Sequence, residues 1–184
     1  MPRHVKGSLF VDYVRMLRFQ KQIDWSRRLE PADLAYLSTQ IDPDGWYPME
    51  PFERFGLAIL AEIAHDDLIA VREWGRMSTE IHTELHPTLL VPNDPCESLM
   101  RLLVLRQSFF DFECLEVRHL TDTEAKVSVH YGMNRRAEQA AAFQTVGFFS
   151  RLVELAGGHD VRAQLNARSW EGDAETTFTV EWSP

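Results

Sequence analysis

The stretch LEVRHLTDTEAKVSVHY, residues 115–131, decides the fold class. Apolar residues alternate with polar or charged ones on both sides of residues 121–123, whose Thr-Asp-Thr sequence is typical of a turn. A period of two over such short runs indicates strands with one buried face, so the stretch predicts a β-hairpin. The same pattern returns in VRAQLNARSWEGDAETTFTVEW, residues 161–182, around a second turn at residues 171–173.

A long helix is predicted between the two hairpins. Residues 137–155 carry alanine and larger apolar residues at helical spacing, and Gly157-Gly158 can end the helix as a C-cap. The resulting order is ββαββ. Because hairpins pair neighbouring strands antiparallel, we expect a four-stranded antiparallel sheet with one face in solvent and the other on helices.

The first 110 residues predict helices instead of strands. Helix starts are indicated by Ser8 as a cap, by Pro31 and Pro51 in first turns, by Asp66 or Asp67, and by Asp94-Pro95. No internal repeat or linker interrupts the chain. We therefore expect one α+β domain over residues 1–184, mainly helical in 1–110 and ββαββ in 111–184, with the N-terminal helices packed on the sheet.

Composition excludes several classes of function. The net charge of −9 argues against nucleic-acid binding, which needs Lys and Arg to neutralise phosphates. No apolar run approaches the roughly 18 residues of a membrane span, and the N-terminus lacks a secretory signal. Two cysteines, Cys96 and Cys114, have no spacing that suggests disulfides or a zinc knuckle. These features predict a cytoplasmic protein.

Charge is distributed unevenly along the chain. Residues 1–28 hold seven Lys or Arg against Asp12 and Asp24, a net +5 that leaves −14 for the remainder. A solvated basic helix face is the simpler interpretation of such a run. A docking surface for an acidic partner is the alternative.

The C-terminal half resembles a known type of domain. Its segments VGFF (146–149) and GGHDV (157–161), and the Gly172-Asp173 turn followed by Phe178, Val180 and Trp182, are similar to the 4-vinyl-reductase-type domain. That domain shares its fold with haem-nitric-oxide-binding domains and with one group of Golgi transport-complex subunits. The resemblance implies a space between helices and sheet that receives haem, aromatic effectors or acyl chains.

The N-terminal half carries a second resemblance. Its motifs KGS (6–8), GWYP (45–48), REWG (72–75) and PNDP (92–95) are similar to those of an uncharacterised paralogous family of about this length in myxobacteria. No activity follows from this likeness.

Haem binding is not expected despite the resemblance. Tyr131-Gly132-Met133-Asn134-Arg135 is similar to the Tyr-x-Ser-x-Arg motif that grips haem propionates, but Met133 replaces the serine. The residue expected to ligate the iron falls at Leu105, and iron without an axial ligand is not held. His82 and His86 are the substitutes that the sequence offers, at a different spacing. We expect no cofactor.

Metal binding and catalysis are not expected either. His82 and His86 can share a helix face as zinc ligands do, but no third ligand is evident, and two solvent-facing histidines are the simpler interpretation. The hairpin cysteines of 4-vinyl-reductase-type domains are absent, with Thr176 in their place. The chain has no nucleophile elbow or phosphate-binding glycine loop. Cys96, in a first helical turn, is interpreted as a packing residue.

An apolar ligand pocket is the leading functional expectation. The sequence is rich in aromatic residues, and ligand pockets are mostly apolar with few polar groups. The residues predicted to line the pocket are Phe55, Trp74, Phe110, Tyr131, Phe143 and Phe148. The chain is then a sensory or regulatory domain, not an enzyme, that binds an apolar small molecule and signals as a homodimer.

The alternative is an interaction module with a solid core and no ligand. Two aromatic residues in the turn-rich segment around Trp46 and Tyr47 either fold back on the core or meet a partner. In this second hypothesis Trp46, Tyr47 and the basic first helix contact a protein partner.

Overall fold

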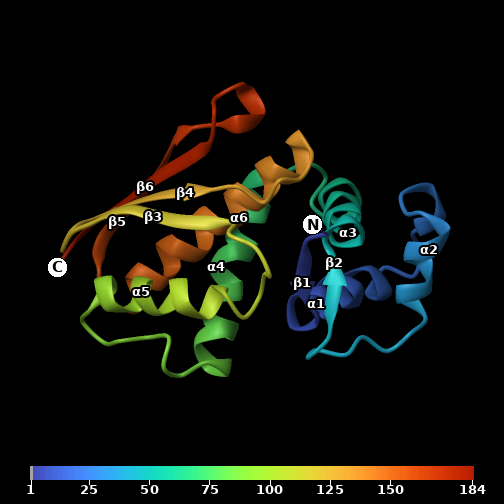
Figure 1. Ribbon diagram of the computed structural model, residues 1–184, viewed down its shortest axis with the longest axis horizontal. Coiled ribbons are helices and arrows are strands. Elements are labelled where there is room, and N and C mark those ends of the chain that lie inside the picture. Colours follow the sequence, from blue (N-terminus) through green and yellow to red (C-terminus); the bar gives the residue numbers. More distant parts are fainter. Residues whose placement is uncertain (1) are drawn as a thin grey trace. The chain divides into compact units, whose positions relative to one another are not determined.

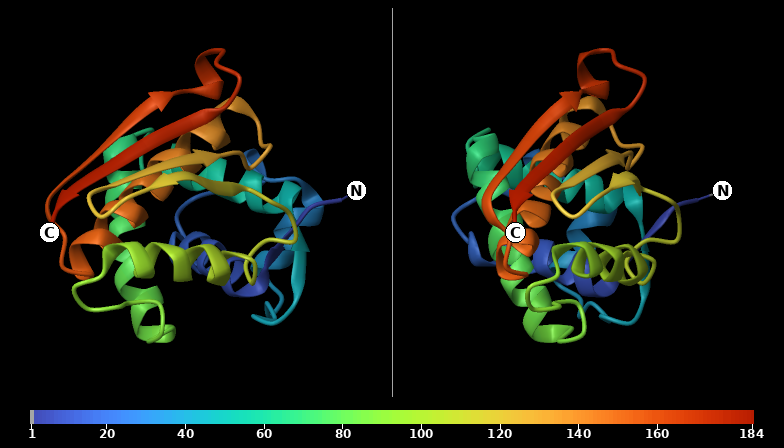
Figure 2. Two further views of the ribbon diagram at one scale, coloured as in Figure 1. Left: turned by 60° about the vertical axis from the view of Figure 1, so that its left-hand side comes forward. Right: turned by 90° about the vertical axis from the view of Figure 1, so that its left-hand side faces the viewer.

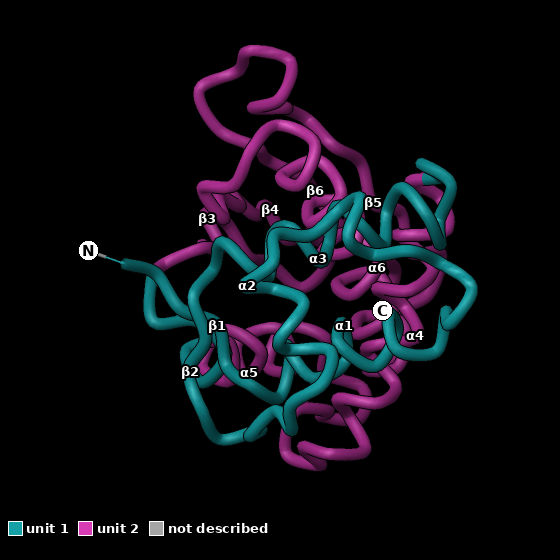
Figure 3. The backbone as a smooth tube through the Cα atoms, turned by 90° about the vertical axis from the view of Figure 1, so that its right-hand side faces the viewer, with its two compact units in different colours: residues 1–67, 107–112 teal, residues 68–106, 113–184 magenta. Residues whose placement is uncertain are grey.

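The computed structural model describes residues 2–184 (Figure 1). The chain divides into two compact units, drawn in two colours in Figure 3. Unit 1 comprises residues up to Asp67 together with Gln107–Phe112, and unit 2 comprises Leu68–Arg106 and Glu113–Pro184. The short return of residues 107–112 to unit 1 is consistent with the bridge between Phe110 and Val5.

Unit 1 is mainly helical. Its elements are β1 (His4–Lys6), α1 (Gly7–Phe19), η1 (Trp25–Arg27), α2 (Pro31–Leu34), η2 (Ala35–Leu37), β2 (Trp46–Pro48) and α3 (Met49–Glu62). The sequence predicted a loop over Trp46-Tyr47-Pro48-Met49, and this was wrong, because β2 pairs antiparallel with β1, with Val5 opposite Tyr47, and Met49 begins α3. The Ser8 cap was also wrong. The N-cap position falls on Lys6, which still belongs to β1, and makes no side-chain cap hydrogen bond.

An aromatic cluster forms the core of unit 1. The ring of Phe10 stacks on Phe55 at 5.2 Å and on Tyr47 at 4.9 Å, with Tyr36 edge-on at 5.0 Å. Offset and edge-on aromatic pairs contribute about 0.5–1.5 kcal/mol beyond the area they bury. Phe10 and Phe55 are completely buried. The cluster therefore fixes α1 against α3 and β2.

Unit 2 contains the sheet. Its elements are α4 (Leu68–Leu85), α5 (Pro95–Arg106), β3 (Leu115–Leu120), β4 (Glu124–Val129), α6 (Arg135–Leu155), β5 (His159–Ala167), η3 (Ser169–Glu171) and β6 (Thr176–Ser183). The strands form one antiparallel sheet in the order β3-β4-β6-β5, which confirms the predicted α+β class and the ββαββ order. Helices α5 and α6 lie on one face of this sheet (Figure 2).

Helices α4 and α6 cross at two glycines. A Cβ atom on Gly75 would lie 2.0 Å from the carbonyl oxygen of Gln144, and one on Gly147 would lie 2.0 Å from the carbonyl oxygen of Arg72. Real side chains do not fit at such distances, so each glycine lets the two backbones touch. Beside the crossing, the two terminal guanidinium nitrogens of Arg76, Nη1 and Nη2, donate to Glu154, at 2.9 and 2.8 Å.

Candidate functional site

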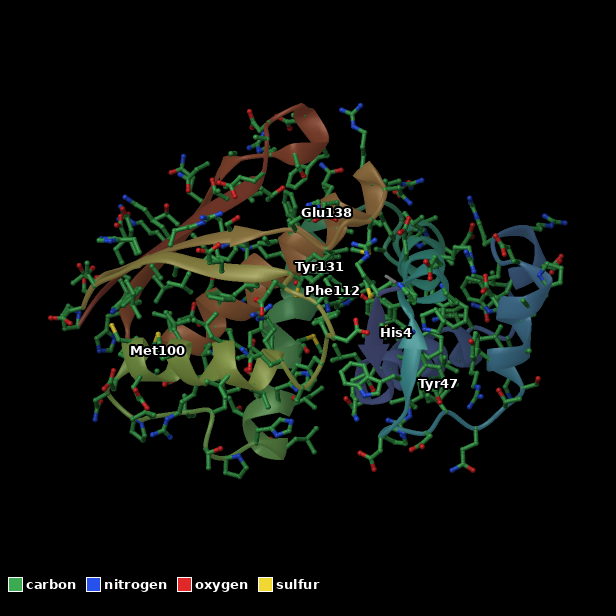
Figure 4. The ribbon with its side chains drawn as sticks, in the orientation of Figure 1. His4, Tyr47, Met100, Phe112, Tyr131 and Glu138 are labelled. Atoms are coloured by element: carbon green, nitrogen blue, oxygen red, sulfur yellow. The ribbon has the colours of Figure 1, made fainter. Side chains whose placement is uncertain are left out.

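The turn from β4 into α6 is organised around a buried carboxylate (Figure 4). Glu138 is 3% exposed, and its two carboxylate oxygens accept hydrogen bonds from the backbone N–H of Tyr131 at 2.6 Å and of Met133 at 3.0 Å. A buried carboxylate needs such donors to offset the loss of water. Asn134 caps α6 by accepting from the N–H groups of Arg136 and Ala137. The turn therefore holds an anion that belongs to the chain itself.

The polar side chains of this turn are also engaged within unit 2. The hydroxyl of Thr145 donates to the carbonyl of Ala141 at 2.8 Å, so the Tyr131 hydroxyl, 2.8 Å from Thr145, acts as the donor in that second bond. The guanidinium of Arg135 donates to the carbonyl oxygen of Trp170, with an Nε–O distance of 2.9 Å. Both side chains thus stabilise the start of α6.

Sequence reasoning did not single out Glu138. A signal was present, because Asn134 is a strong N-cap residue and Glu138 follows in the first turns of the same helix. The burial of Glu138 could not be read from the sequence, since it depends on how the residues after β4 fold back over α6.

Four of the six predicted ligand residues belong to unit 2, where all four are half-buried: Trp74, Tyr131, Phe143 and Phe148. Phe148 faces α4, where its ring lies 5.8 Å from His82 and its carbonyl accepts from Thr79. The ring of Phe143 instead lies 6.5 Å from Trp170 of η3. Helix α6 therefore directs these two aromatic side chains toward different neighbours.

The other two predicted ligand residues belong to unit 1. Phe55 is completely buried in the aromatic cluster around Phe10. Phe110 is half-buried, and its ring lies 5.6 Å from that of Phe112. Phe55 thus packs as core, whereas Phe110 is only half-buried.

Trp46 and Tyr47 lie in different environments. Tyr47 stacks on Phe10, and its hydroxyl accepts from the backbone N–H of Asp42 at 2.9 Å, so it anchors β2 to the core of unit 1. Trp46 is 45% exposed, and the Lys6 ammonium lies 4.9 Å from its ring centre. Alternation along β2 explains the difference, because neighbouring strand residues point to opposite faces.

The pair formed by His82 of α4 and His86, which follows the end of that helix, differs from expectation. His82 was interpreted as facing solvent, and this was wrong, because it is 9% exposed and its ring lies 6.1 Å from that of His86. Burial, followed by the nearby His86, lowers the pKa of His82 below its ordinary value. Across residues 2–184, no three His, Cys, Asp or Glu side chains gather closely enough to hold a metal ion.

The two cysteines lie in ordinary packing environments. Burial raises the pKa of the Cys114 thiol, which accepts a 3.7 Å hydrogen bond from Arg106. Burial also raises the pKa of Cys96, whose thiol donates to the carbonyl of Thr121 at 2.9 Å. A raised pKa leaves both thiols protonated near neutral pH, which lowers their reactivity.

No helix in the described residues is long and apolar enough to cross a membrane.

Comparison with solved structures identifies the fold. The chain is similar to an H-NOX protein from K. algicida in the Fe(II) unliganded state, with 13% identity and a TM-score of 0.69 over 97% of both chains. It is also similar to a mutant of T. tengcongensis H-NOX (12% identity, TM-score 0.64, 97% of this chain and 98% of that chain). An S. oneidensis H-NOX protein in the Fe(II)NO state gives 9% identity and a TM-score of 0.61, with 97% and 99% covered.

No family model and no curated protein matches the sequence. The likeness to H-NOX structures, at such low identity, therefore shows the fold alone: this chain has an α+β fold similar to that of H-NOX proteins.

The residues of this chain do not fit haem. Helix α5, which contains Leu105, has no histidine along its whole length. Its sulfur-containing side chains are those of Met100 and Cys96. Met100 is 48% exposed, and the Cys96 thiol donates a hydrogen bond to Thr121. Tyr131 and Arg135 are engaged by Thr145 and Trp170. The carboxylate of Glu138 already accepts hydrogen bonds from the backbone N–H groups of the same turn. Its negative charge would repel the carboxylate of a haem propionate.

Proposed function

We propose that this chain is a non-catalytic, haem-free regulatory domain of the H-NOX fold that binds an apolar small molecule. The observation that carries the proposal is the combination of that fold, matched over 97% of the chain, with a β4–α6 turn whose donors are already occupied by Glu138. The H-NOX proteins it resembles are described in Fe(II) and Fe(II)NO states. In this chain α5 has no histidine and Glu138 occupies the turn donors, which supports a haem-free use of the same fold.

Half-buried aromatic side chains support an apolar ligand. The fully buried core of unit 2 is supplied by residues such as Phe149 and Phe178, whose rings pack edge-on at 5.3 Å. Phe143 and Phe148, on the same helix, retain partial exposure. Aromatic surface left partly open contributes to binding when an apolar molecule covers it, at about 25 cal/mol per Å².

Native and denaturing mass spectrometry of the freshly purified protein, with an absorption spectrum, tests the proposal. In the mass spectra we expect a bound mass that disappears on denaturation. In the absorption spectrum we expect no Soret band, either in the purified protein or after its incubation with haemin. Titration with anilinonaphthalene sulfonate, a fluorescent apolar anion, should give saturable binding that Phe148→Trp alters. The same substitution at Phe19, which is 81% exposed, is the matched control and should leave the titration unchanged.

A Soret band would contradict the haem-free part of the proposal. A bare mass without probe binding would contradict ligand binding and favour the second candidate function.

That second candidate is an interaction module without a ligand. The exposed aromatic residues of unit 1, Trp46 at 45% and Phe19 at 81%, favour it. Phe19 ends the basic helix α1, near Arg15, whose side chain is exposed. A partner with acidic and apolar side chains would match this surface. Trp46→Ala and Phe19→Ser should then reduce capture of the partner without lowering the melting temperature, because neither side chain is buried.

A further inference from the structure

The sheet of unit 2 ends in two edge strands, β3 and β5. An edge strand presents backbone N–H and C=O groups that can pair with another chain, and natural proteins usually protect such edges with charges, bulges or short strands. The two edges of this sheet differ in that protection, and the difference bears on how the chain associates.

Strand β3 is protected. A register irregularity interrupts its pairing between Val117 and His119, so its ladder is not continuous. Its exposed charges also pair across the surface, since Arg118 lies 3.3 Å from Glu116 and 3.1 Å from Glu175. A further strand is disfavoured at this edge.

Strand β5 has Asp160 and Arg162 at its start and register irregularities near both ends, but it is less protected between those irregularities. From Val161 to Ala167 its sequence is VRAQLNA, in which Arg162 is the single charged residue and no proline or lysine occurs. Pairing with β6 is regular from Arg162 to Leu165, and the irregularities lie nearer the two ends. Within residues 2–184 the backbone of β5 pairs with β6 alone, at the outer margin of the sheet (Figure 2).

The apolar row of β5 is also incompletely covered. Val161, Ala163, Leu165 and Ala167 face the helices, and all four are only half-buried. On the adjacent strand Val180 and Phe178, which pair with Ala163 and Leu165, are buried, as are Thr176 and Trp182. The fully buried core therefore ends at β6, one strand before the edge of the sheet. Additional structure beyond β5 would bury the apolar row of β5 as well.

The sequence of β5 complements itself. Antiparallel pairing of two copies about a two-fold axis at Ala163 sets Val161 opposite Leu165 and Arg162 opposite Gln164. An axis at Gln164 sets Arg162 opposite Asn166 and Val161 opposite Ala167. Neither register brings like charges together, and both join apolar to apolar residues on the inner face. An axis at Arg162 is disfavoured, because it would set this arginine opposite itself.

We infer that two copies of this chain associate through β5, antiparallel across a two-fold axis, and form one continuous sheet. The arrangement is isologous, so it closes at the dimer and does not propagate into filaments. It is independent of the ligand proposed above, since it uses the sheet edge and no residue of the predicted pocket.

Sedimentation equilibrium of the full chain at micromolar concentrations tests this inference. We expect a dimer for the wild type and a dissociation constant at least about tenfold larger for Gln164→Lys. The new lysine faces Arg162 if the axis lies at Ala163, and it faces the lysine of the other copy if the axis lies at Gln164. Gln164 is exposed, so the variant should fold. Thr179→Lys, on the same sheet face of the inner strand β6, is the matched control and should leave the dimer intact.

Gln164→Glu distinguishes the registers. Glutamate faces Arg162 if the axis lies at Ala163, which tightens the dimer, and faces itself if the axis lies at Gln164, which weakens it. A wild-type monomer, or a dimer that Gln164→Lys and Gln164→Glu both leave unchanged, would overturn the inference. So would a dimer that Ile81→Ser, on the exposed face of α4, dissociates while Gln164→Lys does not.

Discussion

The two faces of helix α4 contrast in a way that residue type alone does not explain. The face toward α6 is formed by small or polar residues, namely Gly75, Thr79 and His82 together with Val71, and all four are buried. The opposite face carries Ile69, Met77, Ile81 and Leu85, with exposed fractions of 71%, 62%, 54% and 67%. On this helix, the larger apolar side chains are on the exposed side.

Backbone proximity accounts for the contrast. At the α4–α6 crossing the two helices meet through Gly75 and Gly147, so there is no room for larger side chains. Thr79 adds hydrogen bonds to the carbonyls of Gly75 and Phe148 instead of apolar volume. We therefore expect the stability of unit 2 to depend on the close contact at Gly75 and Gly147 and on the ion pairs of Glu154 beside it. We expect it to depend little on the exposed apolar face of α4.

The largest expected effect comes from filling the crossing. Gly147→Val should destabilise the protein by about 3 kcal/mol, because the new side chain collides with the backbone of Arg72 and the helices must separate. Chemical denaturation followed by circular dichroism measures the change. Gly56→Ala, in α3, is the control, since its added Cβ would lie 3.3 Å from a ring atom of Tyr13, and should change stability by less than about 1 kcal/mol. Equal losses in the two variants would refute the role of the crossing.

A smaller effect is expected at the ion pairs beside the crossing. Hydrogen bonds from Arg76, and then from Arg151, hold the pKa of Glu154 below its ordinary value of 4.5. The folded state therefore favours the carboxylate, and its contribution is present above about pH 4.5 and lost as the pH falls through the folded-state pKa. Glu154→Gln should cost about 1–2 kcal/mol at pH 7.

The pH dependence identifies the cause of that loss. The difference between wild type and Glu154→Gln should shrink in acid, because the wild-type carboxylate becomes protonated. Glu84→Gln, at an exposed position of α4, should match the wild type at both pH values. A Glu154→Gln deficit that stays constant from pH 7 to acid would show that packing, and not charge, is responsible.

The smallest effect is expected on the exposed face of α4. Ile81→Ser should change the unfolding free energy by no more than about 0.5 kcal/mol, because the side chain is already 54% exposed. Thermal melting compared with wild type measures this difference. A loss comparable to that of Gly147→Val would mean that Ile81 is buried in solution, and the contrast between the two faces would fail.

Prediction from sequence succeeded where a periodic pattern ran for many residues. The two hairpins and the helix between them were predicted because periods of two and 3.6 are distinct over such lengths. Strands β1 and β2 were missed, since three residues contain too few repeats to show a period. The irregularity in β3 between Val117 and His119 was also missed, because the alternation of its residues looks regular in the sequence.

Site prediction was limited by a different factor. The absence of a histidine in α5 and the replacement of serine by Met133 are matters of residue identity, and the sequence alone established both. The role of Glu138 was not predictable, because the same glutamate in an exposed first turn would be an ordinary surface residue. Its partners, Tyr131 and Met133, are backbone donors, which any residue type supplies.

The sequence by itself determined the α+β class, the ββαββ order and the absence of histidine from residues 95–106, because these follow from local periodicity and from which side chains are present. The tertiary structure alone decided which surfaces are buried: the glycine crossing of α4 and α6, the enclosed carboxylate of Glu138 and the uncovered row of β5. The physical reason is that burial is a property of pairs of elements. It depends on how closely two backbones approach, and a single segment of sequence does not contain that distance.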